Sequence, residues 1–357
     1  TPSKELAIFL GKSNKGQEIY WQPLEETNPH MVIVGSPGMG KTQLAKAIMY
    51  ELKGKVPCFV IDFANEYGDK KLVGLTLEPG RDLTVNPLEI TEGLFPSSTV
   101  FQVSGILRKI YRLGDQQEAL LRQAIKKVYR DAGVDFYDKT TWSKPIPSFS
   151  TVKKFLEEIA NQGKRQQANT AVRTLNRLEP IFELRVFSGE TQVSLENILK
   201  NGATLFLRDL PTEETKLAVA EFFLRWLWHR MIREGEVRDT LRLTIIMDEA
   251  HKLAYENSPV ADFLRQGRKY GMSIILSTQQ PDDFENKELV FNNCSFRIAL
   301  RLTSVRHAES MARQIALRTP IEVAKEIRKL KQFEALVVGY NYAEPVKVRT
   351  VPYYERT

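Results

Sequence analysis

The stretch Met31-Val-Ile-Val34-Gly35-Ser36-Pro37-Gly38-Met39-Gly40-Lys41-Thr42-Gln43 decides the fold of this 357-residue chain. Four apolar residues, typical of a buried strand, precede a segment that fits G-x-x-x-x-G-K-[ST] at every position, and a helical pattern follows over residues 43–52. The glycines let successive backbone N–H groups turn inward toward a phosphate, and the helix adds its positive N-terminal dipole. The sequence therefore predicts a nucleoside triphosphate site.

Each residue of this loop has an expected role. We expect Lys41 to reach the β- and γ-phosphates and the Thr42 hydroxyl to bind Mg²⁺. The backbone of the loop should surround the phosphates, so we assign nucleotide binding to Gly35, Ser36, Pro37, Gly38, Met39, Gly40, Lys41, Thr42 and Gln43. The expected ligands are ATP and Mg²⁺.

Short apolar runs without alternation recur along the chain, with helical patterns between them. Strands buried on both faces of a parallel sheet show this pattern, which indicates an α/β fold. The expected strands are Met31–Val34, Cys58–Ile61, Ala203–Leu207, Leu243–Met247, Met272–Leu276, Phe296–Leu300 and Ala335–Val338.

One long segment contains no convincing strand. Residues 94–199 show only helical patterning, so we expect an all-helical insertion between a first core segment at 1–93 and a second at 200–357. Between Ser104 and Arg185 there are 16 Lys and Arg against 9 Asp and Glu, a surplus of 7 that equals the net charge of the whole chain, +7. A solvated helical face and a surface for nucleic acid both remain open.

The strand Leu243–Met247 delivers two carboxylates, Asp248 and Glu249, at its carboxyl end. Ligands bind at that edge of open α/β sheets, so Asp248 is predicted to hold Mg²⁺ and Glu249 to deprotonate the attacking water. A helix N-cap followed by a first-turn glutamate is the alternative. The letters of Asp248–His251 spell the label of a helicase group, but the chain has no room for the second lobe of those enzymes. We expect His251 to lie on a helix face.

Polar residues also flank the next strand. Gln279 lies at its carboxyl end and is predicted to sense the γ-phosphate. Arg265, Arg268 and Lys269 precede the strand and so lie toward the opposite edge, where an arginine can serve the nucleotide of a neighbouring subunit. Ordinary surface arginines remain the alternative.

In this order and spacing, the motifs resemble the HerA/FtsK superfamily of hexameric motor ATPases, particularly its HerA-like branch. The resemblance covers most of the chain, and it rests on the following segments: Phe9–Ser13, Glu18–Trp21, the phosphate loop after His30, Ile61–Tyr67, Asn86–Leu88, Asp248–Glu249, Gly267–Gly271 and Thr278–Pro281. Residues 258–271 are also similar to the DptH-type ATPases of DNA restriction.

The resemblance implies a RecA-like core, a helical insertion, ATP and Mg²⁺ as ligands, and a homo-oligomer, expected to be a hexamer. It also implies that Arg268 acts in trans and that Asp62 and Glu66 fall near the nucleotide, so we count Glu249, Lys41, Gln279, Arg268 and Glu66 as catalytic. HerA proteins typically begin with a small β-barrel domain. The 34 residues before Gly35 are too few for one, so we expect either a piece of a longer protein or a relative without the barrel.

Two functions from different classes stay open. The first is a motor that moves along duplex DNA without sequence preference, with a nuclease or restriction partner. The second is a secretion or conjugation-type ATPase that acts on protein or channel components. Basic clusters that could contact DNA phosphates are Arg108-Lys109 with Arg112, Lys126-Lys127 with Arg130, Lys164-Arg165 and residues 301–318, and none of them interleaves with aromatic residues.

The composition excludes several other classes. Two cysteines form neither a metal spacing nor a disulfide framework, and no run approaches the roughly 18 apolar residues that span a bilayer. We therefore expect a cytoplasmic protein without a membrane span.

Overall fold

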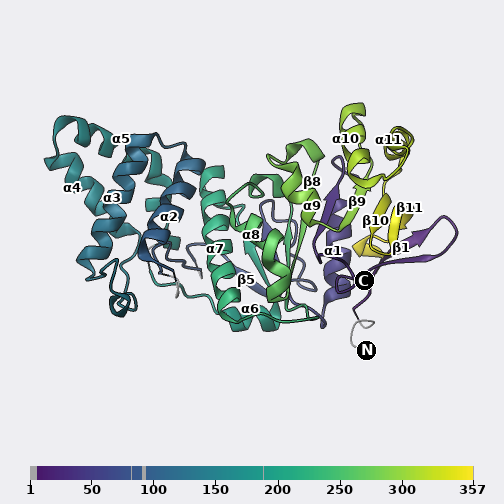
Figure 1. The fold of residues 1–357 in the computed structure, drawn as a ribbon, viewed down its shortest axis with the longest axis horizontal. Coiled ribbons are helices and arrows are strands. Elements are labelled where there is room, and N and C mark those ends of the chain that lie inside the picture. Colours follow the sequence, from purple (N-terminus) through teal and green to yellow (C-terminus); the bar gives the residue numbers. More distant parts are fainter. Residues whose placement is uncertain (1–5, 82, 91–93, 188, 357) are drawn as a thin grey trace. The chain divides into compact units, whose positions relative to one another are not determined.

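The computed structural model describes residues 6–81, 83–90, 94–187 and 189–356. The chain divides into two compact units (Figure 1). The core unit comprises Thr1–Thr76, Leu195–Phe206 and Arg230–Thr357, and the helical unit comprises Leu77–Ser194 and Leu207–His229.

A single sheet organises the core unit, in the order β2-β1-β11-β10-β9-β3-β8-β7-β4-β6-β5. The strands are β1 (Ile8–Ser13), β2 (Glu18–Trp21), β3 (Met31–Val34), β4 (Cys58–Asp62), β5 (Leu75–Leu77), β6 (Ala203–Phe206), β7 (Leu243–Met247), β8 (Met272–Thr278), β9 (Phe296–Leu300), β10 (Glu334–Gly339) and β11 (Tyr342–Thr350). The six strands from β9 to β6 pair in parallel, which confirms the predicted α/β class with a mainly parallel sheet. Every strand expected from the sequence is present.

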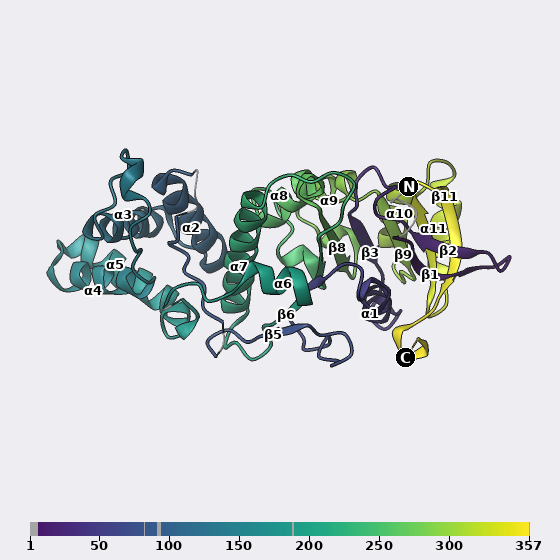
Figure 2. The ribbon, with the colours of Figure 1, turned by 90° about the horizontal axis from the view of Figure 1, so that it is seen from below.

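An antiparallel extension continues the sheet beyond β9. β10 pairs antiparallel with β9 and with β11, and β1 pairs antiparallel with β11 and with β2, so both ends of the chain contribute neighbouring strands (Figure 2). The sequence analysis expected β10 but did not identify β1, β2 or β11 as strands. The pairing of β1 with β11 joins residues more than 300 positions apart, which local patterning does not report, whereas β2 and β11 also pair with their neighbours in the sequence, β1 and β10.

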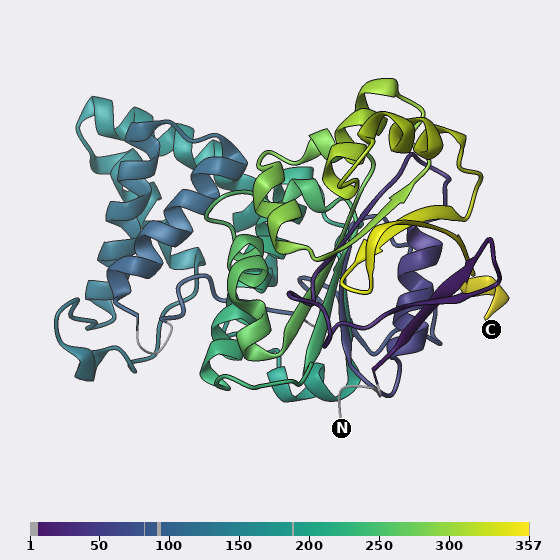
Figure 3. The same ribbon diagram turned by 45° about the vertical axis from the view of Figure 1, so that its right-hand side comes forward.

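Helices cover the parallel strands. The helices of the core unit are α1 (Lys41–Leu52), α6 (Leu195–Asn201), α8 (Pro259–Gln266), α9 (Lys287–Asn293), α10 (Val305–Ile315) and α11 (Pro320–Lys329). Helix α1 packs against the strands of the sheet (Figure 3). It buries Leu44, Ile48 and Leu52 in a cluster with alternate residues of β1, β3 and β10. All seven residues of β8 are buried, as expected for a strand covered on both faces. No helix in the described part of the chain is both long and apolar enough to cross a membrane.

The helical unit contains α2 (Pro96–Tyr111), α3 (Asp115–Asp131), α4 (Ser150–Gln162), α5 (Arg165–Phe182) and most of α7 (Glu213–Arg233). Its boundaries differ from the expected 94–199, because the unit begins at Leu77 and adds Leu207–His229. Helix α7 is apolar on several sides, and its Phe222 packs edge-on against Phe187 at 5.5 Å between ring centroids. Contacts between residues distant in the sequence place α7 in the helical unit, and local sequence patterns do not predict such contacts.

A buried histidine links two central strands. His30 is fully buried, and its Nδ1 accepts a hydrogen bond from the backbone N–H of Ile274 at 3.1 Å. Burial lowers the pKa of His30 to about 3 from its usual 6.5. His30 therefore becomes protonated at a lower pH in the folded chain than in the unfolded chain. The contribution of neutral His30 to the free energy of unfolding is complete above pH 6.5 and is lost as the pH falls toward 3.

We expect His30→Asn to flatten the acid side of the stability profile. Asparagine can keep an acceptor near the position of Nδ1 but removes the titration, whose slope approaches about 1.4 kcal/mol per pH unit. Urea unfolding at pH 7 and at pH 4.5 measures this, and the wild type should lose more free energy of unfolding than the variant over the interval. Equal losses would contradict the assignment.

Candidate active site

The phosphate loop connects the end of β3 to the start of α1. The Gly35 N–H donates to the Thr278 carbonyl at 3.2 Å, and the Ser36 N–H donates to the Arg301 carbonyl at 2.9 Å. Because β3 pairs in parallel with β8 on one side and β9 on the other, these bonds hold the loop at the carboxyl edge of the sheet. Pro37 and Gly38 at the tip are exposed, while Ser36 and Met39 are half-buried.

Gly40 is the position of the loop that most needs glycine. Its φ is 108°, in the left-handed region, and a Cβ there would lie 2.7 Å from the Phe333 ring. The Phe333 N–H in turn donates to the Met39 carbonyl at 3.3 Å. The chain just before β10 therefore buttresses the loop, a contact that the motif alone does not reveal.

Lys41 lies buried at the first position of α1. Its Nζ donates to the Gly35 carbonyl at 2.8 Å, across the mouth of the loop. Burial lowers the pKa of Lys41, and the carboxylates of Asp248, Glu249 and Glu66 oppose that shift. Of the neighbouring loop residues, Gln43 has a buried amide oxygen without a hydrogen-bond partner among the described residues.

Three of the predicted residues converge beside Lys41. The Thr42 hydroxyl donates to Glu66 Oε2 at 2.8 Å and lies 3.4 Å from Asp248 Oδ2. Asp248 also accepts hydrogen bonds from the Ser277 hydroxyl and, at 3.0 Å, from the Glu249 N–H. The carboxylate of Asp248 is therefore held in the site and does not cap a helix.

This oxygen cluster fits Mg²⁺. Hydroxyl and carboxylate oxygens are the ligands that Mg²⁺ prefers, and the ion usually completes its shell with water and phosphate. Among the described residues no group of three His, Cys, Asp or Glu could hold a metal ion without such help. Thr42 and Asp248 would hold the ion, with Glu66 beside them.

Asp62 organises the loop that follows β4. Its Oδ1 accepts from the N–H groups of Ala64 and Glu66, both at 3.1 Å, and its Oδ2 accepts from Tyr67 at 2.9 Å. Because these bonds occupy both oxygens, Asp62 shapes the loop after β4 and brings Glu66 to Thr42.

Glu249 has an unusual backbone conformation for a non-glycine residue. Its φ and ψ are 49° and 38°, in the left-handed region, which costs about 1–3 kcal/mol. Gln279 Nε2, at the end of the adjacent strand β8, donates to Glu249 Oε1 at 3.1 Å. The turn thus presents the carboxylate to the residue that was predicted to sense the γ-phosphate.

His251 lies in this site, and the expectation of a helix face is wrong. It belongs to a short 3-10 turn, Ala250–Lys252, and its Nδ1 lies 3.1 Å from the Thr278 hydroxyl. The Thr278 hydroxyl, which also donates to Asp283 at 3.2 Å, thus joins His251 to the chain after β8. His251 Nε2 faces Glu249 Oε2 at 3.9 Å. No sequence signal distinguished this histidine, because its partners come from β8.

Arg301 is a second residue at this edge that the sequence analysis did not assign to the site. It directly follows β9, and its exposed side chain starts beside Ser36. Position after a buried strand, the signal that identified Gln279, would have found it.

The structure places the predicted basic residues at the other edge. Arg268 lies in a 3-10 turn, Gly267–Tyr270, before β8, where its guanidinium is exposed and donates to the Thr27 carbonyl. It therefore lies apart from the phosphate loop of its own chain. Arg265 forms an ion pair with Glu256.

Comparisons with known proteins identify relatives and similar folds. The DNA import protein CedB of Sulfolobus acidocaldarius is 23% identical over 307 residues, which are 80% of this chain and 46% of that protein. The chain thus spans about half the length of this relative. VirB4 of Thermoanaerobacter pseudethanolicus has a similar fold, with a TM-score of 0.80, 20% identity and 99% of each chain covered.

The plasmid coupling protein TrwB in complex with ADP and Mg²⁺ also has a similar fold, with a TM-score of 0.63, 15% identity, and 98% of this chain and 90% of that chain covered. The RecA-like P-loop class is therefore confirmed. A family model described as the central domain of the helicase HerA matches residues 8–227, more than half of the chain. The chain belongs to this HerA family, within the HerA/FtsK superfamily of ATPases.

Proposed function

We propose that this protein hydrolyses ATP and converts the released energy into movement along duplex DNA, as a hexameric ring that works with a nuclease or restriction partner. The observation that carries the proposal is the pairing of Glu249 with Gln279 at the edge that also holds Lys41 and Thr42. A subunit that only binds nucleotide needs no base at this position, whereas an enzyme that turns over does.

The residues suggest a sequence of roles. Lys41 exchanges its bond with the Gly35 carbonyl for the phosphates of the nucleotide, which are stronger partners because they are charged. Mg²⁺ bound with the nucleotide would neutralise phosphate charge. Glu249 accepts the proton of the attacking water, and Gln279 orients that water and the carboxylate together.

Loss of the γ-phosphate would reach the rest of the sheet through β8. Gln279 follows Thr278, the last residue of that strand, and Arg268 precedes its first residue. A displacement of one end of a buried, hydrogen-bonded strand displaces the other end as well, because a close-packed core does not deform continuously. This strand would link the site to a neighbouring copy.

Duplex DNA is the proposed substrate because the chain is basic and its relative CedB is described as a DNA import protein. Contacts to phosphate need no sequence recognition, in agreement with the basic clusters of the chain. A conjugation or secretion role on protein components is the second candidate, which the fold similarity to VirB4 and to the coupling protein TrwB favours.

We expect linear duplex DNA to raise the ATPase rate several-fold at low salt, and the stimulation to disappear at high salt. Affinity for duplex falls by about 0.9 log units per contacted phosphate per tenfold increase in salt. A coupled ATPase assay with a salt series measures both effects. ATPase activity that ignores DNA at every salt concentration would reject the DNA motor and favour the second candidate.

A further inference from the structure

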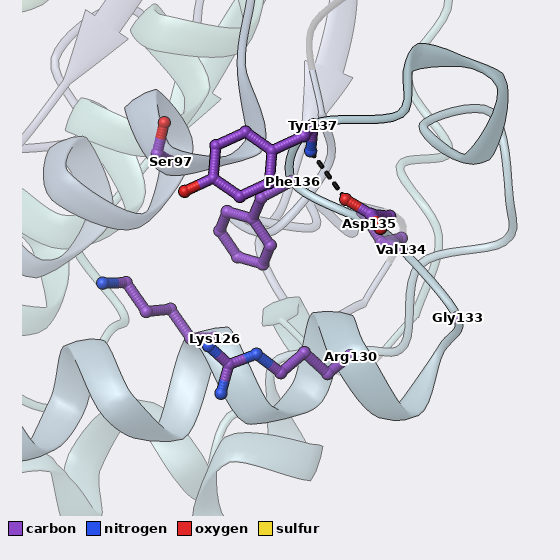
Figure 4. A pocket seen from close by; sticks show the side chains of 8 residues that line it. All are labelled: Ser97, Lys126, Arg130, Gly133, Val134, Asp135, Phe136 and Tyr137. Atoms are coloured by element: carbon purple, nitrogen blue, oxygen red, sulfur yellow. Dashed lines mark hydrogen bonds between the residues drawn. The ribbon is translucent and has the colours of Figure 1, made fainter.

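A cavity of about 520 Å³ opens on the helical unit, whereas the residues assigned to ATP hydrolysis belong to the core unit. We call it the Tyr137 pocket. It is lined by Ser97 of α2, Lys126 and Arg130 of α3, and the loop residues Gly133, Val134, Asp135, Phe136 and Tyr137. Figure 4 shows the side chains of Lys126 and Arg130 on α3, across the pocket from the rings of Phe136 and Tyr137.

The two cations of the pocket differ from three of their basic neighbours on α2 and α3. Arg108 and Arg122 form ion pairs with Glu118, and Lys127 forms an ion pair with Asp131. Lys126 and Arg130 make no ion pair with any described residue. They lie four positions apart, on one face of α3.

One acidic residue also lines the pocket. The Asp135 carboxylate accepts a hydrogen bond from the Tyr137 N–H at 2.8 Å, so it is engaged within its own loop. Lys126 Nζ lies 5.9 Å from the centre of the Phe101 ring, on the same surface. The lining therefore carries two positive charges against one negative charge, a net charge of +1.

The aromatic side of the pocket is exposed but held in place. Tyr137 is 94% exposed, which is unusual for so large a ring, and Phe136 packs edge-on against the buried Tyr129 at 6.0 Å. The Trp142 indole N–H donates to the Asp135 carbonyl at 2.7 Å and ties the loop together. These contacts fix the backbone that presents both rings, so binding there would cost little additional ordering.

We propose that the Tyr137 pocket binds an unpaired segment of single-stranded nucleic acid, with a base stacked on Tyr137 and the adjoining phosphates on Lys126 and Arg130. Cationic groups beside exposed rings are the combination by which proteins hold single strands without sequence preference. A base within a duplex cannot offer its face to Tyr137, so the pocket distinguishes strands that are already open. The basic residues of α3 do not interleave with aromatic residues in the sequence, and the rings of the pocket come from the loop after α3.

The test is fluorescence anisotropy of a labelled oligonucleotide, either single-stranded or annealed to its complement, without ATP. We expect Tyr137→Ala to weaken single-strand binding by roughly 5- to 100-fold, the range found for loss of one stacked base. Tyr137→Phe should bind like the wild type because it keeps the ring. In the proposed complex Lys126 and Arg130 each contact one phosphate. The double variant Lys126→Gln with Arg130→Gln should therefore show a shallower dependence of log affinity on log salt concentration, by about 0.7 for each lost contact.

Lys127→Gln is the matched control, because it removes one charge from the same helix at an ion-paired position. Lys127→Gln should weaken single-strand binding less than Lys126→Gln alone or Arg130→Gln alone. Wild-type affinity in Tyr137→Ala, or equal losses for the single strand and the duplex, would overturn the proposal. The proposal does not depend on the DNA motor: if DNA fails to stimulate ATPase activity but Tyr137→Ala still loses the single strand, only the proposed function fails.

Discussion

Glu249→Gln is expected to lower kcat for ATP hydrolysis by roughly 10²- to 10⁴-fold, the usual contribution of a general base. Glutamine keeps the size of the side chain and can still contact Gln279, but it cannot accept a proton from water. Nucleotide affinity should stay close to that of the wild type, because the Glu249 side chain bonds to Gln279 and forms no hydrogen bond with the described residues of the phosphate loop. Phosphate release under saturating ATP, with affinity from a fluorescent ATP analogue, separates the two effects.

Lys41→Ala provides the opposite pattern and serves as the contrast. Its loss removes the positive charge at the mouth of the loop, where Nζ now bonds to the Gly35 carbonyl, so nucleotide binding itself should fail. Circular dichroism checks that both variants fold. Turnover at the wild-type rate in Glu249→Gln would refute the assigned base, and Asp248 and Glu66 would then be the carboxylates to test.

Arg268→Ala is expected to cut hydrolysis by roughly 10³-fold or more while it leaves nucleotide affinity nearly unchanged, as for arginines that act on a neighbouring site. The structure agrees with action in trans, because Arg268 precedes β8 whereas the phosphate loop lies at the other end of that strand. Lys269→Ala is the matched control. It removes an exposed charge from the same turn and should retain most of the activity.

Mixing the two inactive variants tests whether sites are shared between subunits. An Arg268→Ala subunit keeps its own Glu249, and a Glu249→Gln neighbour can supply the missing arginine. Partial recovery of ATPase activity on mixing is therefore expected, together with an oligomer in mass photometry. No recovery at any mixing ratio would count against the shared site and against the ring.

The phosphate loop, the acidic pair and the strands of the parallel core could be identified from the sequence alone. Each depends on a few adjacent residues whose local chemistry is restrictive. The loop from Gly35 to Thr42 needs glycine, lysine and threonine at set positions, and the strand before Asp248 needs consecutive apolar residues because both of its faces are buried. Position after a strand then placed Gln279 at the right edge.

Other features were decided only by the tertiary structure. His251 became part of the site because β8 brings Thr278 beside it, and α7 joined the helical unit because its aromatic side chains pack there. The rings of the Tyr137 pocket meet the cations of α3 only after the loop at 133–142 folds back. The partners of His251 and of α7 lie more than 25 positions away in the sequence, and the pocket needs a fold of the loop that local patterning does not report.

The physical reason is the range over which each kind of information acts. Backbone preference and hydrophobic periodicity act over a few residues, so they determined which segments form strands and which residues end them. The order in which strands pair, and hence which side chains meet, depends on the burial of the whole core. For this protein, the sequence by itself determined the chemistry of the nucleotide site, and the folded sheet decided which residues surround it.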